Sequence, residues 1–112
     1  MIEVVNLKRV QLPSRVDEAV VVYVGRRMPG RSGSPLANPF KLQPGQTRGH
    51  CLQQYREWLD AQLTRDTAAK RELSRLAGIA REESLLLACW CAPALCHADV
   101  IKERIEKLLE EK

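Results

Sequence analysis

The stretch LLLACWCAPALCHAD, residues 85–99, decides the fold that we expect for this chain. Its first part, residues 85–91, is continuously apolar, which is typical of a strand buried on both faces of a sheet. Residues 92–95 contain a proline and suit a tight turn, and Cys96 opens a segment with helical spacing of apolar residues. A buried strand followed at once by a helix indicates an α/β protein, in which ligands bind beside strand ends and helix starts.

Apolar patterns in the rest of the chain complete the expected set of elements. Residues 3–7 and 19–24 are rich in β-branched side chains, which favours strands. Residues 50–63 and 67–80 have apolar residues at three- and four-residue spacing, as on one face of a helix. The order β, β, loop, α, α, β, α predicts a small three-layer, Rossmann-like α/β domain whose short, mostly parallel sheet is flanked by helices.

The length and the hydropathy pattern narrow the class of protein. A chain of 112 residues can bury one modest core, so we expect a single α/β domain over residues 1–112. No apolar run reaches the length of about 18 residues that a membrane helix needs, and the amino terminus lacks a secretion pattern. We therefore expect a cytoplasmic protein without a membrane partner, in which cysteines serve as buried thiols, metal ligands or reactive thiolates.

The positive charge of the chain is concentrated in one acid-free segment. The formal net charge is +4, and no acidic residue occurs between Glu18 and Glu57. Six basic residues lie in that interval: Arg26, Arg27, Arg31, Lys41, Arg48 and Arg56. Residues 25–49 are rich in glycine and proline, which predicts a long loop, and long ordered loops in small domains are usually functional. We expect the segment to attract anions, although its arginines could also serve only to keep a loop-rich stretch in solution.

The cysteines and the histidine within residues 89–97 permit several kinds of chemistry. The four ligands of a tetrahedral zinc site could come from Cys89, Cys91, Cys96 and His97. Their spacing along a strand differs from that of common zinc knuckles, so no metal is the preferred interpretation. A reactive thiol at Cys96 or Cys91 is a second alternative, because a helix start favours the thiolate. A structural role suits Cys89 best, since buried cysteine packs as a small hydrophobe.

For the helix start we prefer a fourth interpretation, in which Cys96, His97 and Asp99 form the rim of a ligand pocket. Backbone N–H groups at a helix start bind anions, and Asp99 could complement the helix dipole or cap the first turn. In a catalytic site His97 or Asp99 could act as acid or base, and Cys96 as nucleophile. Paired carboxylates, a phosphate-binding Gly-Lys motif and a complete nucleophilic triad are absent from the sequence, so catalysis stays open.

Several motifs in a fixed order resemble the family catalogued as domain of unknown function 4326. They are VYVGR at residues 22–26, SPLANPF at 34–40, YREWL at 55–59 and LACWC through CHADV at 87–100. The resemblance covers nearly the whole chain and implies a small α/β protein of bacteria or phages, with no established activity. The family has glycine where this chain has Ala37 and Ala98, so a role that needs positive φ or close ligand approach is in doubt at these two positions.

The family pattern also indicates which positions lie together. If the strands of Val22 and Leu87 are adjacent and parallel, their carboxyl ends meet at one edge of the sheet. The residues that we expect to bind a ligand there are Gly25, Arg26, Asn38, Phe40 and Arg48. Glycine would let the backbone approach the ligand, arginine could bind a phosphate or carboxylate, and asparagine could orient a polar group.

We therefore expect a domain that binds an anionic small molecule, phosphorylated or nucleotide-like, at the carboxyl edge of its sheet, and whose action as an enzyme on nucleotides is left open. Two alternatives from other classes remain. One is a nucleic-acid-binding module that sets the arginines against a phosphate backbone. The other is a zinc-binding interaction protein built on the cysteine and histidine cluster.

Overall fold

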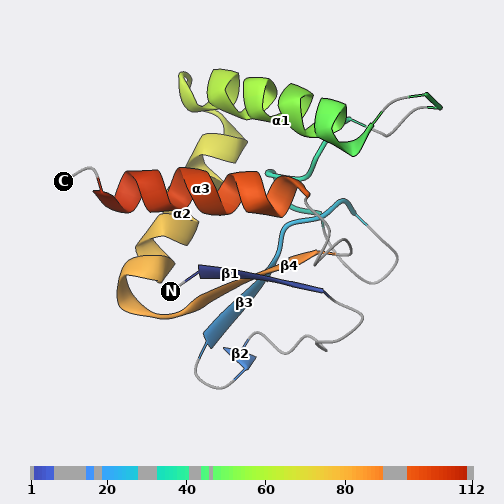
Figure 1. The fold of residues 1–112 in the computed structure, drawn as a ribbon. Helices are drawn as coiled ribbons and strands as arrows, with labels where there is room; N and C mark the ends of the chain where they lie inside the picture. The colour runs from blue at the N-terminus through green and yellow to red at the C-terminus, as the bar shows by residue number, and fades with distance from the viewer. Residues whose placement is uncertain are drawn as a thin grey trace.

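A computed structural model gives the fold of the chain and describes residues 2–6, 15–16, 19–27, 33–40, 44–45, 47–89 and 96–110; at 15–16 and 48–50 it describes the backbone alone. Within these ranges seven elements follow one another along the chain, and Figure 1 shows how they are arranged. They are β1 (Ile2–Asn6), β2 (Arg15–Val16), β3 (Ala19–Tyr23), α1 (Arg48–Leu63), α2 (Ala68–Glu82), β4 (Leu85–Cys89) and α3 (His97–Glu110). The predicted order of strands and helices is confirmed, with one further short strand, β2, between the first two predicted strands.

The sheet has the order β1-β4-β3-β2, so the strand that decided the fold prediction lies between two parallel neighbours. Val4 of β1 pairs with Leu87 of β4, and Val22 of β3 pairs with the same leucine from the other side. The expectation that the strands of Val22 and Leu87 are adjacent and parallel is therefore confirmed. Among the described strands, only the short β2 runs antiparallel, against the start of β3. The carboxyl ends of β1, β3 and β4 consequently lie at one edge.

The main hydrophobic core lies between the sheet and the helices. Leu85, Leu87 and Cys89 alternate onto one face of β4, and each is at most 1% exposed. Buried residues of all three helices join them in a single cluster, and Figure 1 shows the helices stacked on that side of the sheet. The opposite face has a smaller cluster around Val21 and Ala88. An α/β domain with a short, mostly parallel sheet flanked by helices is confirmed, and the described helices cover the Leu87 face.

The helices follow the spacing of their apolar residues and their local caps. In α2 the buried positions are Ala69, Leu73, Leu76 and Ala77, which recur every three or four residues. The Thr67 hydroxyl accepts a hydrogen bond from the Lys70 N–H at 3.1 Å, as expected for the helix cap. Among the described helices, none combines the length and apolar character that a bilayer crossing requires.

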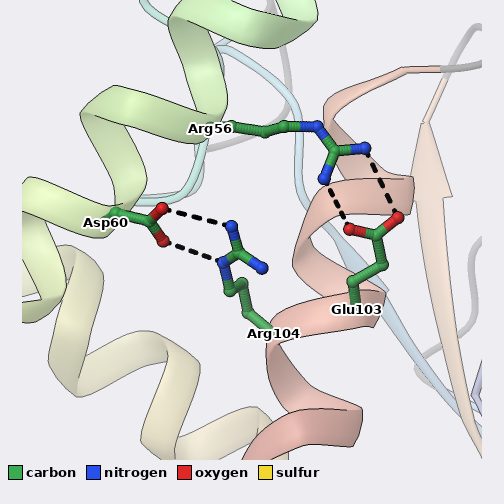
Figure 2. A network of polar contacts seen from close by, with 4 residues as sticks. All are labelled: Arg56, Asp60, Glu103 and Arg104. Atoms are coloured by element: carbon green, nitrogen blue, oxygen red, sulfur yellow. Dashed lines mark hydrogen bonds and ion pairs between the residues drawn. The ribbon is translucent and has the colours of Figure 1, made fainter.

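Two ion pairs join α1 to α3 on the outside of the helical layer, and Figure 2 shows both. Arg56 Nη1 lies 2.6 Å from Glu103 Oε2, and Arg104 Nε lies 2.9 Å from Asp60 Oδ1. We call these four residues the interhelical ladder. Because the pairs are partly exposed, each stabilises the fold by about 0–1 kcal/mol at most. The ladder also means that the positive charge of Arg56, counted above in the acid-free segment, is neutralised by a carboxylate from α3.

Candidate functional site

The carboxyl end of β3 turns sharply at Gly25. Val24 N–H still donates to Ala88 O at 3.1 Å, so pairing with β4 continues one residue past the strand. At Gly25 an added Cβ would lie 2.4 Å from the Tyr23 hydroxyl oxygen, and that hydroxyl donates to Arg26 O at 2.6 Å. A side chain at this position would displace the Tyr23 ring from its place over the chain, so the glycine has a role in local packing apart from any ligand.

The Arg26 guanidinium connects this strand end to the loop that follows. Its Nε donates to Asn38 O at 2.8 Å, and its Nη2 donates to Phe40 O at 2.9 Å. The Asn38 side chain in turn accepts from Phe40 N–H at 2.9 Å, which holds the two carbonyls in place. Arg26 is exposed, and both partners are uncharged backbone groups. Three residues predicted as ligand-binding thus lie in direct contact, with the arginine oriented and its charge not neutralised by these bonds.

Tyr55 of α1 binds the same loop. The sequence did not indicate that Tyr55 is a site residue. Its hydroxyl donates to Leu36 O at 2.7 Å, and the residue is fully buried. Burial raises the pKa of Tyr55 far above its ordinary value, with the nearby Cys96 adding to the effect, so the hydroxyl remains a donor. The sequence does contain one signal, which is a tyrosine on the apolar face of a predicted helix. A hydroxyl buried there needs a polar partner from another part of the chain.

His97 ties the start of α3 to the end of β3. Its Nε2 lies 2.7 Å from Val24 O, and its ring meets the Tyr55 ring edge-on at 5.4 Å between centroids. Burial lowers the pKa of His97 below 6.5, and the positive charge of Arg26 lowers it further, against the opposing effects of the Val24 bond and Asp99. The ring is therefore neutral at pH 7. A neutral ring that donates from Nε2 to a carbonyl has its lone pair on Nδ1.

Cys96 and Asp99 form the first turn of α3. The Cys96 N–H donates to Asp99 Oδ2 at 2.9 Å, so the expectation that this carboxylate reaches back to cap the turn is confirmed. The Cys96 side chain is only 4% exposed and points to Cys89, with 3.4 Å between the sulfur atoms. The structure thus places the Cys96 thiol in the core beside Cys89, whereas the backbone of this turn lies next to the strand edge.

Two more residues predicted for the site are Cys91 and Arg48. Cys91 and the Arg48 side chain lie outside the described residues, so the predictions for them remain predictions. Within the described ranges no group of three or more His, Cys, Asp or Glu side chains is arranged to hold a metal ion. The doubt about glycine at position 98 is settled by the structure. Ala98 lies in α3 and is fully buried, so its methyl group fills space in the core and the backbone needs no positive φ.

The sequence profile of one family covers nearly all of these elements. The family described as a domain of unknown function (DUF4326) matches residues 5–107. No curated protein and no solved structure matches the chain. The matched range includes the strand ends, the loop bound by Arg26 and the start of α3, so the resemblance seen in the sequence motifs is confirmed. The chain belongs to the DUF4326 family.

Proposed function

We propose that this domain binds an anionic small molecule, phosphorylated or nucleotide-like, at the carboxyl edge of its sheet. The observation that supports this most is the state of Arg26. Two backbone carbonyls hold its guanidinium in one orientation, the side chain is exposed, and these bonds leave further N–H groups for a ligand. An arginine that is oriented in advance loses little conformational entropy on binding, and its planar donors match a phosphate or carboxylate.

The surroundings of Arg26 favour an anion as well. The α3 start lies at the same edge, because His97 contacts Val24 O, and the partial positive charge of a helix start favours anions. Arg27, the next residue, is also exposed. Asp99 works in the opposite direction, since its carboxylate occupies the Cys96 N–H. The anion would therefore depend chiefly on the arginine, with the helix start in a supporting role.

A catalytic role for Cys96, His97 or Asp99 remains a prediction, because each makes a contact that also stabilises the fold. The thiol packs on Cys89, the imidazole donates to Val24 O, and the carboxylate caps α3. In an enzyme built on this site, His97 Nδ1 is the atom that we expect to accept a proton, since Nε2 is occupied by the carbonyl.

The nucleic-acid alternative would use a longer run of positive charge. Arg26 and Arg27 are adjacent and exposed, but Arg56 is paired with Glu103. Arg31 and Lys41 lie outside the described residues. Among the described side chains, two neighbouring cations at a strand end match a small anion better than an extended phosphate backbone, which is normally contacted by many basic side chains.

The experiment compares the natural chain with Arg26→Gln and with the matched control Arg27→Gln, which removes the same charge one residue away. Titration calorimetry would use inorganic phosphate, pyrophosphate, nucleoside mono-, di- and triphosphates and a short DNA oligonucleotide. We expect one small phosphorylated compound to bind, with affinity about 10–100-fold lower in Arg26→Gln, as expected for loss of a charge-assisted hydrogen bond.

The control should change the same affinity less than about threefold, because none of the described hydrogen bonds orients the Arg27 side chain and its exposed charge acts only through attraction screened by solvent. Absence of binding by every small compound would contradict the proposal. Equal losses in both variants, accompanied by steeply salt-dependent oligonucleotide binding, would favour the nucleic-acid alternative.

A further inference from the structure

Two cysteines from separate elements meet in the core beside the proposed ligand site. Cys89 is the last residue of β4, and Cys96 immediately precedes α3. Their sulfur atoms are 3.4 Å apart, the side chains are 1% and 4% exposed, and the two residues are not joined in a disulfide. The proposed ligand site makes no use of this pair of thiols.

The close approach of the sulfurs is set by the backbone around them. Cys89 faces the helices because it shares the side of β4 that bears Leu87. Cys96 is fixed by the Asp99 cap and by the neighbouring His97, which binds Val24 O. Neither anchor depends on the sulfur–sulfur contact. The two thiols are thus held next to each other by the fold, and a covalent bond needs them to approach to about 2.05 Å.

We propose that Cys89 and Cys96 form a reversible intrachain disulfide, which makes the junction of β4 and α3 a thiol–disulfide switch. With a peroxide as oxidant, one thiol loses its proton and attacks the O–O bond, giving a sulfenic acid and hydroxide, which takes up that proton as water. The second thiol attacks the sulfenic sulfur, and the S–S bond forms as a second water leaves. Two thiols supply two electrons, and the peroxide is reduced to two waters.

The reverse reaction needs a dithiol reductant, which exchanges through a mixed disulfide and leaves as its own disulfide. Because both sulfurs are buried, oxidation requires local opening at this junction and should be slow compared with that of an exposed thiol. In the oxidised form the start of α3 is bonded covalently to the end of β4. The inference does not depend on the proposed ligand, since it concerns only the pairing of the thiols.

The experiment treats the folded natural chain with hydrogen peroxide, alkylates the remaining thiols in denaturant and maps the peptides. Chymotrypsin is suited to this map, because cleavage after Trp90 and Leu95 separates Cys89, Cys91 and Cys96. We expect one linked pair of peptides containing Cys89 and Cys96, with Cys51 and Cys91 alkylated. Dithiothreitol should restore four alkylated thiols.

Closure of this short loop should raise the melting temperature by about 5–10 °C in the oxidised form. Cys51→Ser should keep the linked peptides and the shift, whereas Cys96→Ser should lose both. Four alkylated thiols after oxidation, or a linkage that includes Cys51 or Cys91, would overturn the proposal. The map of the natural chain gives this answer even if a variant fails to fold, and it is independent of whether any phosphorylated compound binds.

Discussion

The arginines at the strand edge and those of the interhelical ladder are used in different ways. Arg26 donates to the carbonyls of Asn38 and Phe40, which carry no formal charge. Arg56 and Arg104 bind carboxylates across α1 and α3, as Figure 2 shows. Both environments fix the guanidinium, but only the first leaves its charge available. The partner of an arginine, more than the number of basic residues nearby, therefore indicates whether its charge remains available.

The loop at the carboxyl edge of the sheet packs closely on neighbouring backbone at Gly33, whereas α2 leaves open space at Gly78. Substitution of these two glycines should give the largest difference between the two regions. An added Cβ at Gly33 would lie 2.6 Å from Arg27 N, whereas at Gly78 in α2 it would meet nothing within 4 Å. We expect Gly33→Ala to lower the free energy of unfolding by about 1–3 kcal/mol.

Gly78→Ala is the matched control and should raise the free energy of unfolding by about 0.5–1 kcal/mol, because alanine is the better helix former. Urea denaturation followed by circular dichroism measures both values. If Gly33→Ala were as stable as the natural chain, the backbone packing described for the strand edge would be wrong.

The two regions should also respond to acid in different pH ranges. The pKa of His97 is lowered below 6.5 in the folded protein, chiefly by burial, so the unfolded chain binds the proton more tightly. Stability should consequently fall as the pH drops through 6.5, by at most about 1.4 kcal/mol per pH unit. In the ladder, the hydrogen bond from Arg56 lowers the pKa of Glu103 below 4.5, so its contribution is lost only at lower pH.

Chemical denaturation between pH 5 and pH 7.5 measures the His97 contribution as a slope, independently of any overall loss of stability. We expect His97→Asn to flatten the slope. An unchanged slope in His97→Asn would mean that the imidazole is not held neutral beside Val24.

Breaking the ladder should give the smallest effect. A double-mutant cycle with Arg56→Gln and Glu103→Gln should give a coupling free energy of about 0.2–1 kcal/mol that decreases as salt is added. The affinity for a phosphorylated ligand should not change, since this arginine is neutralised and the strand edge is intact. A coupling above about 2 kcal/mol, or a large loss of ligand affinity, would remove the distinction between the two regions.

Much of the fold could be predicted because strong local patterns determine it. The apolar run before Cys89 and the β-branched run before Gly25 became neighbouring parallel strands. The Asp99 cap was also readable, since it depends on a three-residue spacing. Such features arise from interactions within a few residues, and a single sequence contains the information needed.

Parts of the candidate site could not be predicted because they depend on contacts between distant residues. Arg56 was counted as a free positive charge, and its partner lies 47 residues away on α3. Tyr55 lies within the helix predicted over residues 50–63, yet its hydroxyl donates to Leu36 O on the distant loop. Cys96 was placed at a rim, and its thiol turned inward to Cys89. Spacing along a chain does not show which side chains meet once helices pack on a sheet.

Whether Arg26 binds an anion can be measured from the Nε–H signals of the arginine side chains by nuclear magnetic resonance. Phosphate, pyrophosphate and the nucleoside monophosphates would each be added to ¹⁵N-labelled protein. Arg26 Nε–H donates to Asn38 O and Arg104 Nε–H donates to Asp60 Oδ1, so each signal reports on one of the two regions. We predict a saturable shift of the Arg26 signal with at least one compound, while the Arg104 signal stays in place. Equal shifts of both signals, or no shift of Arg26 with any compound, would mean that Arg26 does not bind a phosphorylated ligand.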